Sequence, residues 1–292
     1  MKVTRYGIAL LVLTLGLWSC GSKKEANDNS EEFKQAEESL SDDIKDLESN
    51  LPSPTEIPYL LQETGAEFNQ SLLNDKKKAD SYLTRNDKAA LNLGVYAADI
   101  GYLVSYDKTQ EAIDYVTASK KLANGLGVLG SFDQEALKSF EKNISNKDSL
   151  TKLVNDAVKE TEKYLRGDNR IKPAALMLTG SFIEGLYIST GLIKTYPKDL
   201  KDEDRMLVLT PLLRVVLQQR ESIDDLAKML GGVEQTEPVT SILEKLNSLE
   251  GNYRDLNIEE KIKNNQADKI LTDKNLASIT STVENLRKSI VE

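Results

Sequence analysis

The sequence predicts an all-α protein: a multi-helix bundle, or a solenoid-like array of helical hairpins, with about ten helices. Two observations lead to this prediction. Apolar residues recur at three- and four-residue intervals through most of the chain, which is the spacing of one face of a helix. Proline is scarce, with 7 residues in 292, and glycine is modest at 16, which disfavours a turn-rich β architecture.

The first predicted helix runs from about Ser30 to Leu51 and carries a one-sided apolar stripe. Pro52 and the prolines after it end this helix. Pro58 is suited to the first turn of a second helix, which we expect to continue to about Asn74.

Two apolar helices are predicted at the centre of the domain, over residues 87–106 and 173–195. Each contains glycines, although glycine costs about 1 kcal/mol relative to alanine inside a helix. In the first helix the small residues form a stripe: Ala90, Gly94, Ala97, Gly101 and Ser105. Close packing of a neighbouring helix explains such a stripe, and a groove for a ligand or an acyl chain is the alternative. Similar patterns in the two helices also suggest a faint duplication.

The other helices are predicted from periodicity and capping signals. Thr210-Pro211 suggests that one helix ends at Leu209 and the next begins there, although one long helix kinked at Pro211 is an alternative. We treat 30–292 as one helical domain, with a subdivision considered near 197–200. The remaining predicted helices span 108–122 (closed by Asn124-Gly125), a short segment after Ser131, 148–165 (capped by Asp148), a segment ending at Gly231-Gly232, 238–264, and 272–290 (capped by Thr272).

The first 20 residues have the three parts of a secretory signal. Lys2 and Arg5 provide a positive start, residues 7–18 form an apolar core, and Leu17-Trp18-Ser19 precede Cys20, the only cysteine. The apolar core has 12 residues, whereas a helix that spans a bilayer needs about 20. This arrangement resembles the lipobox of bacterial lipoproteins, although Trp18 is bulkier than the residue usual at its position.

The resemblance implies that residues 1–19 are a signal peptide and that Cys20 is the lipidation site. Residues 20–29 are then a polar tether, too poor in apolar residues to fold. Several acyl chains on one cysteine would anchor the protein stably. Gly21 stands where an aspartate would signal inner-membrane retention, so the resemblance implies the outer membrane of a Gram-negative bacterium.

Charge and composition narrow the functions that the sequence allows. The net charge is −9, and removal of Lys2 and Arg5 with the signal would lower it to −11, which opposes nucleic acid binding. The chain contains no histidine, and acylation of Cys20 would leave no thiol. We therefore predict no catalytic residues, no metal site and no cofactor.

Asp99 and Glu184 are the candidate site residues, because each is the lone acid in the interior of an apolar core helix. A buried carboxylate without a partner is costly, so each is expected to face a partner or solvent. A structural role, paired with a cation, a tyrosine hydroxyl or water, is one interpretation. The other is a shared polar pocket between the two helices, lined by Tyr96, Tyr102, Tyr106 and Tyr187.

Three functions are compatible with these features. The favoured one is a lipid-anchored cell-envelope protein that acts as a binding or scaffold module and engages another envelope protein through its helical surface. The alternative is a carrier of a small molecule or lipid in a pocket between helices 87–106 and 173–195. An enzyme that uses carboxylates and tyrosines comes third, and we predict that the protein is not an enzyme.

Overall fold

The computed structural model describes Leu47 and the ranges 50–128, 134–143, 146–167, 170–196, 202–257, 260 and 274–292. The predicted signal peptide, Cys20, the tether and nearly all of the first predicted helix lie outside these residues, as do 197–200. The chain divides into two compact units, Met1–Ser39 and Leu40–Glu292. All the described residues belong to the second unit, which includes both sides of the subdivision considered near 197–200.

The described residues form helices joined by turns, with no strand among them, so the all-α prediction is confirmed. Two 3₁₀ turns, η1 (Gln70–Leu72) and η2 (Lys76–Lys78), precede the first long helix. The α-helices are α2 (Glu56–Glu63), α3 (Ala79–Tyr82), α4 (Asn86–Ser105), α5 (Thr109–Gly125), α6 (Gln134–Lys142), α7 (Lys147–Gly167), α8 (Ile171–Thr195), α9 (Asp202–Leu217), α10 (Arg220–Gly232), α11 (Val239–Asp255) and α13 (Lys274–Val291).

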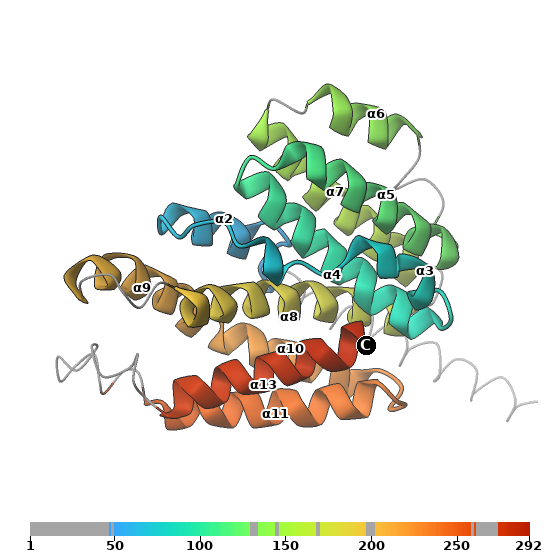
Figure 1. The fold of residues 1–292 in the computed structure, drawn as a ribbon. Coiled ribbons are helices and arrows are strands. Elements are labelled where there is room, and N and C mark those ends of the chain that lie inside the picture. Colours follow the sequence, from blue (N-terminus) through green and yellow to red (C-terminus); the bar gives the residue numbers. More distant parts are fainter. Residues whose placement is uncertain are drawn as a thin grey trace, which may run out of the picture. The chain divides into compact units, whose positions relative to one another are not determined.

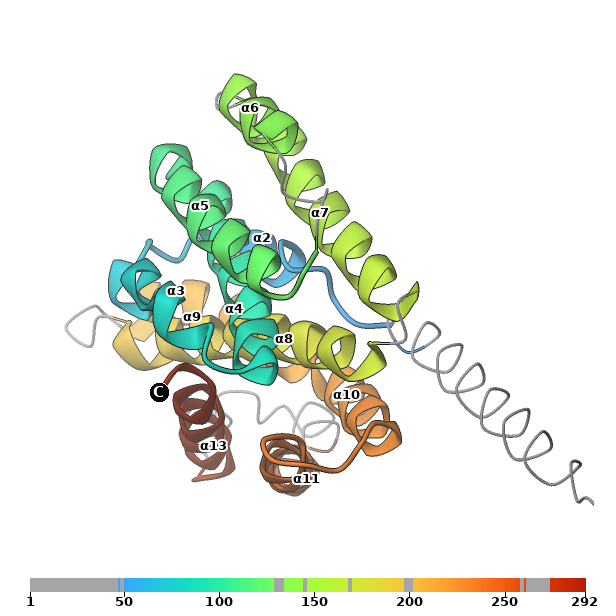
Figure 2. The ribbon, with the colours of Figure 1, turned by 90° about the vertical axis from the view of Figure 1, so that its right-hand side faces the viewer.

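Helices α4 and α8 form the centre of this unit and share its most extensive contact. Helices α2, α5 and α7 pack on α4, while α9, α10 and α13 pack on α8 (Figure 1). The view in Figure 2 shows α11 beside α13 on the side of α8 that faces away from α5. The main partner of α4 is therefore a helix far along the chain, not the next hairpin. This is a bundle and not a solenoid-like array.

The backbones of α4 and α8 touch where their glycines meet. A Cβ atom added at Gly94 would lie 1.9 Å from the carbonyl oxygen of Met177, and one added at Gly180 would lie 1.9 Å from that of Leu91. Both distances are far shorter than any tolerated contact, so only glycine fits at these positions. Within the stripe of small residues, Gly94 thus serves close packing of α4 on α8. Gly101 instead lies against the segment before α2, where an added Cβ would be 2.7 Å from the Pro54 carbonyl oxygen.

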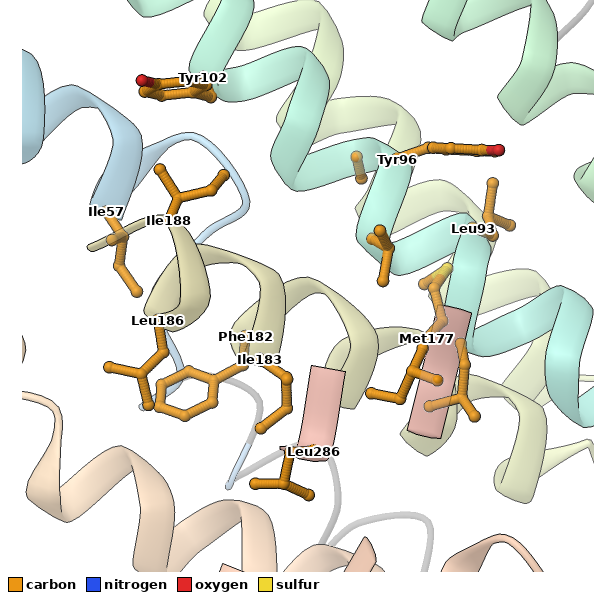
Figure 3. Close-up of a cluster of buried hydrophobic side chains, with 14 of the residues drawn as sticks. Ile57, Leu93, Tyr96, Tyr102, Met177, Phe182, Ile183, Leu186, Ile188 and Leu286 are labelled. Atoms are coloured by element: carbon orange, nitrogen blue, oxygen red, sulfur yellow. The ribbon is translucent and has the colours of Figure 1, made fainter. Parts of the chain in front are cut away.

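Helix α8 is almost completely enclosed by the bundle. By length and composition it could cross a membrane, but 89% of its most apolar window is buried. Figure 3 shows Phe182, Ile183 and Leu186 of α8 pointing toward Leu286 of α13. Leu286 is completely buried there, and burial of such a side chain contributes about 1.5–3 kcal/mol to folding. The apolar periodicity of residues 173–195 therefore reflects a core helix.

Two predicted helices end earlier than their patterns suggested. The helix expected to reach Asn74 ends at Glu63, and Gly65 follows with a φ of +80°, a conformation that favours glycine and ends helices. The helix expected to reach Asn264 ends at Asp255, followed by Asn257 with a φ of +47°. In both places a local left-handed residue stops the helix although apolar residues continue beyond it.

Other predicted boundaries also require correction. Asn146, not Asp148, caps α7, because its side-chain oxygen accepts a hydrogen bond from the Ser149 amide at 2.9 Å. Helix α9 continues through Pro211 and ends at Leu217, and α10 begins at Arg220. The boundary predicted at Thr210-Pro211 is therefore wrong, and so is the alternative of one helix reaching Gly232. At the end of α5 the left-handed residue is Gly127, with a φ of +70°, while Gly125 still belongs to the helix. The caps predicted at Ser131 and Thr272 lie outside the described residues.

The close approach of α4 and α8 predicts that Gly180→Ala is destabilising. The added methyl group would overlap the Leu91 carbonyl oxygen, so we expect the free energy of unfolding to fall by at least about 1–3 kcal/mol. Gly251→Ala is the matched control, because Gly251 lies within α11 and a Cβ there would meet nothing within 4 Å. That substitution should raise stability by up to about 1 kcal/mol. Urea unfolding measures the free energy of unfolding of both variants. An equal gain in stability for Gly180→Ala and Gly251→Ala would contradict the backbone contact.

Candidate functional site

The crossing of α4 and α8 brings the two candidate acids together in the core. Asp99 lies on α4 and Glu184 on α8, and both are 0% exposed. Their carboxyl groups lie within hydrogen-bonding reach of each other. Each acid therefore faces the other. The sequence suggested this pairing, because the two acids lie at neighbouring positions of the possible repeat, but it did not establish it.

Arg287 of α13 supplies the positive charge of this cluster. Its Nε donates a hydrogen bond to Glu184 Oε2 at 3.1 Å, and its Nη2 donates to Glu184 Oε1 at 3.2 Å. This is the two-point geometry in which guanidinium and carboxylate groups interact most strongly. The guanidinium also lies over the ring of Tyr187, 4.5 Å from its centre. Three helices thus meet at one buried charge pair.

Asp99 has less hydrogen-bonding support than Glu184. Its Oδ2 accepts a hydrogen bond from the backbone amide of Asn74 at 3.2 Å. Its Oδ1 is enclosed, and none of the described residues donates a hydrogen bond to it. An ionised carboxylate with one such oxygen is poorly stabilised in a protein interior.

The buried residue Asn74 connects Asp99 to the neighbouring helices. Its carbonyl oxygen accepts a hydrogen bond from the Tyr115 hydroxyl of α5 at 2.8 Å. Its side-chain oxygen lies 3.2 Å from the Tyr82 hydroxyl of α3, which is also 3.0 Å from the carbonyl oxygen of Val291. The loop before η2 is therefore fixed by contacts with several helices, and so is the amide that binds Asp99.

The same polar layer holds the end of α13 against α4. The side-chain amide of Asn92, completely buried on α4, donates a hydrogen bond to the Ile290 carbonyl oxygen at 3.0 Å. The last carbonyl groups of a helix have no partner within the helix. Partners from α3 and α4 therefore satisfy the end of α13, and Arg287 binds Glu184 one turn before that end.

The four tyrosines predicted to line a shared pocket fall into two groups. Tyr187 covers Arg287, and Tyr96 lies close enough to Asp99 to feel its charge while donating a hydrogen bond to the Asp75 carbonyl oxygen at 3.0 Å. Nearer the end of α4, Tyr102 instead stacks with Phe68, and the ring of Tyr106 packs at a tilt against the same Phe68 ring. Two of the four tyrosines therefore border the acids and two belong to another cluster.

Burial is the main influence on the titration of the two acids. It raises the pKa of Asp99 well above its usual range, the charge of Glu184 raises it further, and Arg287 opposes both effects. Burial also raises the pKa of Glu184, while the charge and hydrogen bonds of Arg287 lower it. Burial tends to lower the pKa of Arg287, but Glu184 outweighs this effect and raises it. The two carboxyl groups titrate as a pair.

Solvent does not reach the acids of this cluster. Both acids are fully buried, and the Arg287 side chain is 16% exposed. The geometry allows the cluster to neutralise charge, hold a proton and fix three helices, but it offers no open space for a substrate at the acids. Within the described ranges, no group of three histidine, cysteine or acidic residues could hold a metal ion.

Comparison with known proteins provides no relative. No protein-family model matches the chain. No curated protein and no solved structure matches it either. The interpretation of the cluster therefore depends on its own geometry.

Arg287, Asn74 and Asn92 belong to the cluster but were not predicted from the sequence. Two signals were present. Arg287 lies four residues after Val283 and four before Val291, on the buried face of its helix, and Asn92 is a lone amide in an apolar helix. Asn74 gave no signal, because its main contribution is a backbone amide that depends on the path of a loop.

Arg287→Met should destabilise the bundle strongly. The substitution leaves two buried acids without a cation, and loss of one member of a buried ion pair costs about 3–5 kcal/mol. Lys194→Met is the matched control, since Lys194 of α8 pairs with Glu284 of α13 between the same two helices, but with 58% and 36% of the side chains exposed. This control should cost less than about 1 kcal/mol.

Urea unfolding of both variants measures the difference. In the double variant Arg287→Met/Glu184→Gln, removal of the orphaned charge should restore part of the lost stability, a coupling that a double-mutant cycle detects. Equal, small losses for Arg287→Met and Lys194→Met would show that the buried pair does not hold α13.

Proposed function

We propose that the protein is a lipid-anchored protein of the cell envelope that acts as a binding or scaffold module. In this proposal acylated Cys20 holds the protein at a membrane, in the outer membrane of a Gram-negative bacterium. The helical bundle then engages another envelope protein through its surface. The resemblance of residues 17–20 to a lipobox supports the anchor.

One observation carries the choice of a binding module. The acids that could have formed an active site or a ligand pocket are completely buried and are used to join α4, α8 and α13. A general acid or base must reach its substrate, whereas among the described residues the groups that meet these two carboxyl groups are Arg287, the Asn74 amide and the other acid. Binding through the surface requires no such group.

Packing at the centre of the bundle favours this proposal over a carrier. A carrier would hold its cargo between α4 and α8, yet the backbones of these helices are in contact at Gly94 and Gly180. Binding cavities for small molecules usually have volumes of about 300–1,000 Å³. Such a cavity at this crossing would require the two helices to separate.

The surface also offers apolar side chains for contact with a protein. Leu207 of α9 is 73% exposed, and further large apolar side chains are exposed on α2, α7 and the segment after α3: Tyr59, Tyr164 and Leu83. Aromatic and large aliphatic residues are typical anchors of protein interfaces. We propose that they contribute to the contact with the partner.

Fatty-acid labelling tests the anchor. The full chain, produced in a Gram-negative host, should incorporate an alkyne-bearing palmitate analogue and lose residues 1–19. Cys20→Ala should abolish the labelling, because the thiol that accepts the lipid is then absent. A wild-type chain that stays unlabelled, or that keeps its leader, would refute lipid anchoring.

Site-specific photocrosslinking in intact cells tests the binding module. A photoreactive amino acid in place of Leu207 should yield a discrete crosslinked product with another envelope protein, because we place this side chain in the interface. The same amino acid in place of Lys152, exposed on α7, serves as the control and should not yield that product. Absence of any product from Leu207, Tyr164 and Tyr59 alike would contradict binding through the helical surface.

A further inference from the structure

The buried cluster contains two carboxyl groups and one cation. Asp99, Glu184 and Arg287 are the charged groups involved, and among the described residues no other charged side chain hydrogen-bonds or ion-pairs with either acid. If both acids were ionised, the cluster would carry a net negative charge without access to water. Burial of an uncompensated charge is so costly that such groups usually become neutral instead.

The hydrogen bonds distinguish the two acids. Both carboxylate oxygens of Glu184 accept hydrogen bonds from Arg287. Asp99 accepts one hydrogen bond, from a backbone amide to Oδ2. Its Oδ1 is enclosed, and no described residue donates a hydrogen bond to it. Two ionised carboxylates cannot hydrogen-bond to each other, because both only accept. A proton on Asp99 turns that group into a donor, and the Glu184 carboxylate is the acceptor within reach.

We infer that Asp99 and Glu184 form a proton-binding site that holds one proton at neutral pH, on Asp99, with the negative charge on Glu184 facing Arg287. The arrangement then contains one carboxylate, one guanidinium and one neutral carboxylic acid. The inference is independent of the proposed function, since it concerns only the interior of the bundle.

The surroundings of the pair determine how it responds to pH. Besides Arg287, the titratable groups that act on the two acids are tyrosines from the elements packed around them: Tyr82 of α3, Tyr96 of α4, Tyr115 of α5 and Tyr187 of α8. Burial raises the pKa of each of these hydroxyl groups. They therefore stay neutral while the acid pair titrates.

The proton couples pH to the docking of α13. When Asp99 is protonated, Arg287 balances one charge. When the proton leaves, two adjacent carboxylates repel each other beneath α13. Because the pKa of Asp99 is raised in the folded state, the folded protein binds the proton more tightly than the unfolded chain. This contribution to stability is present at low pH and is lost as pH rises from about 4 through the folded-state value.

Carbon NMR of the wild-type full chain, labelled with ¹³C at the aspartate side-chain carboxyl group, tests the proton directly. One aspartate resonance should keep the chemical shift of a protonated acid at about pH 7, while ordinary aspartates ionise near pH 4. This resonance should be absent from Asp99→Asn. A spectrum in which every aspartate is ionised at about pH 7 would refute the inference. A protonated glutamate at that pH, seen with glutamate labelling, would overturn the assignment to Asp99.

Unfolding as a function of pH provides a second test. Asn at position 99 mimics the protonated acid, since its amide can donate to Glu184 and its oxygen can accept from Asn74. The urea midpoint of the wild type should therefore fall relative to that of Asp99→Asn as pH rises above about 4. Asp156→Asn, at an exposed position of α7, is the control, and its difference from the wild type should not follow this trend. A constant difference between the wild type and Asp99→Asn would count against the proton. If Asp99→Asn fails to fold, the wild-type spectra decide the question.

Discussion

The arrangement of the bundle depends on the need to neutralise charge in its core. Two acids point into the interior from the two most buried helices, and water does not reach them. Among the residues that the structure describes, Arg287 of α13 is the one cation that pairs with these acids. Loss of one partner from such a pair is far more costly than loss of an exposed ion pair. The position of α13 is therefore determined by charge as well as by its apolar stripe.

Glycine makes this charge cluster geometrically attainable. Gly94 and Gly180 allow the backbones of α4 and α8 to touch, and this contact brings Asp99 and Glu184 within reach of each other. A bulkier residue at either glycine would separate the helices and move the two acids apart. The glycine contact between the two backbones thus allows the acids to approach each other elsewhere along the same pair of helices.

Hydrogen bonds give the polar layer its specificity. Apolar stripes tolerate small rotations and shifts, because dispersion forces have little directionality. The hydrogen bonds of Asn74, Asn92 and Tyr82 do not tolerate such shifts, because each joins particular atoms of different elements. A shifted α13 would leave buried polar groups without partners, and such groups are costly. The interior of the proposed binding module is accordingly held in one arrangement, and its surface is free to make contacts.

The helical class, the two central helices and the two unusual acids could be predicted from the amino-acid sequence. Periodicity predicted 87–106 and 173–195 closely, since a helix buries a face at regular local intervals. It also identified Asp99 and Glu184, because an acid in an apolar helix contradicts its surroundings. The predicted ends of two helices were wrong. These helices end at Glu63 and Asp255, because the left-handed conformation of one following residue outweighs the apolar pattern.

The partners of these residues depend on how the helices pack against one another. Glu184 and Arg287 are 103 residues apart in the chain, and a helical pattern shows which face is buried but not which helix covers it. The predicted tyrosine lining also divided into two groups, because Tyr96 and Tyr102 leave α4 toward different neighbours. Local periodicity follows from the geometry of one helix. The pairing of charges follows from the packing of several helices, which local patterns do not specify.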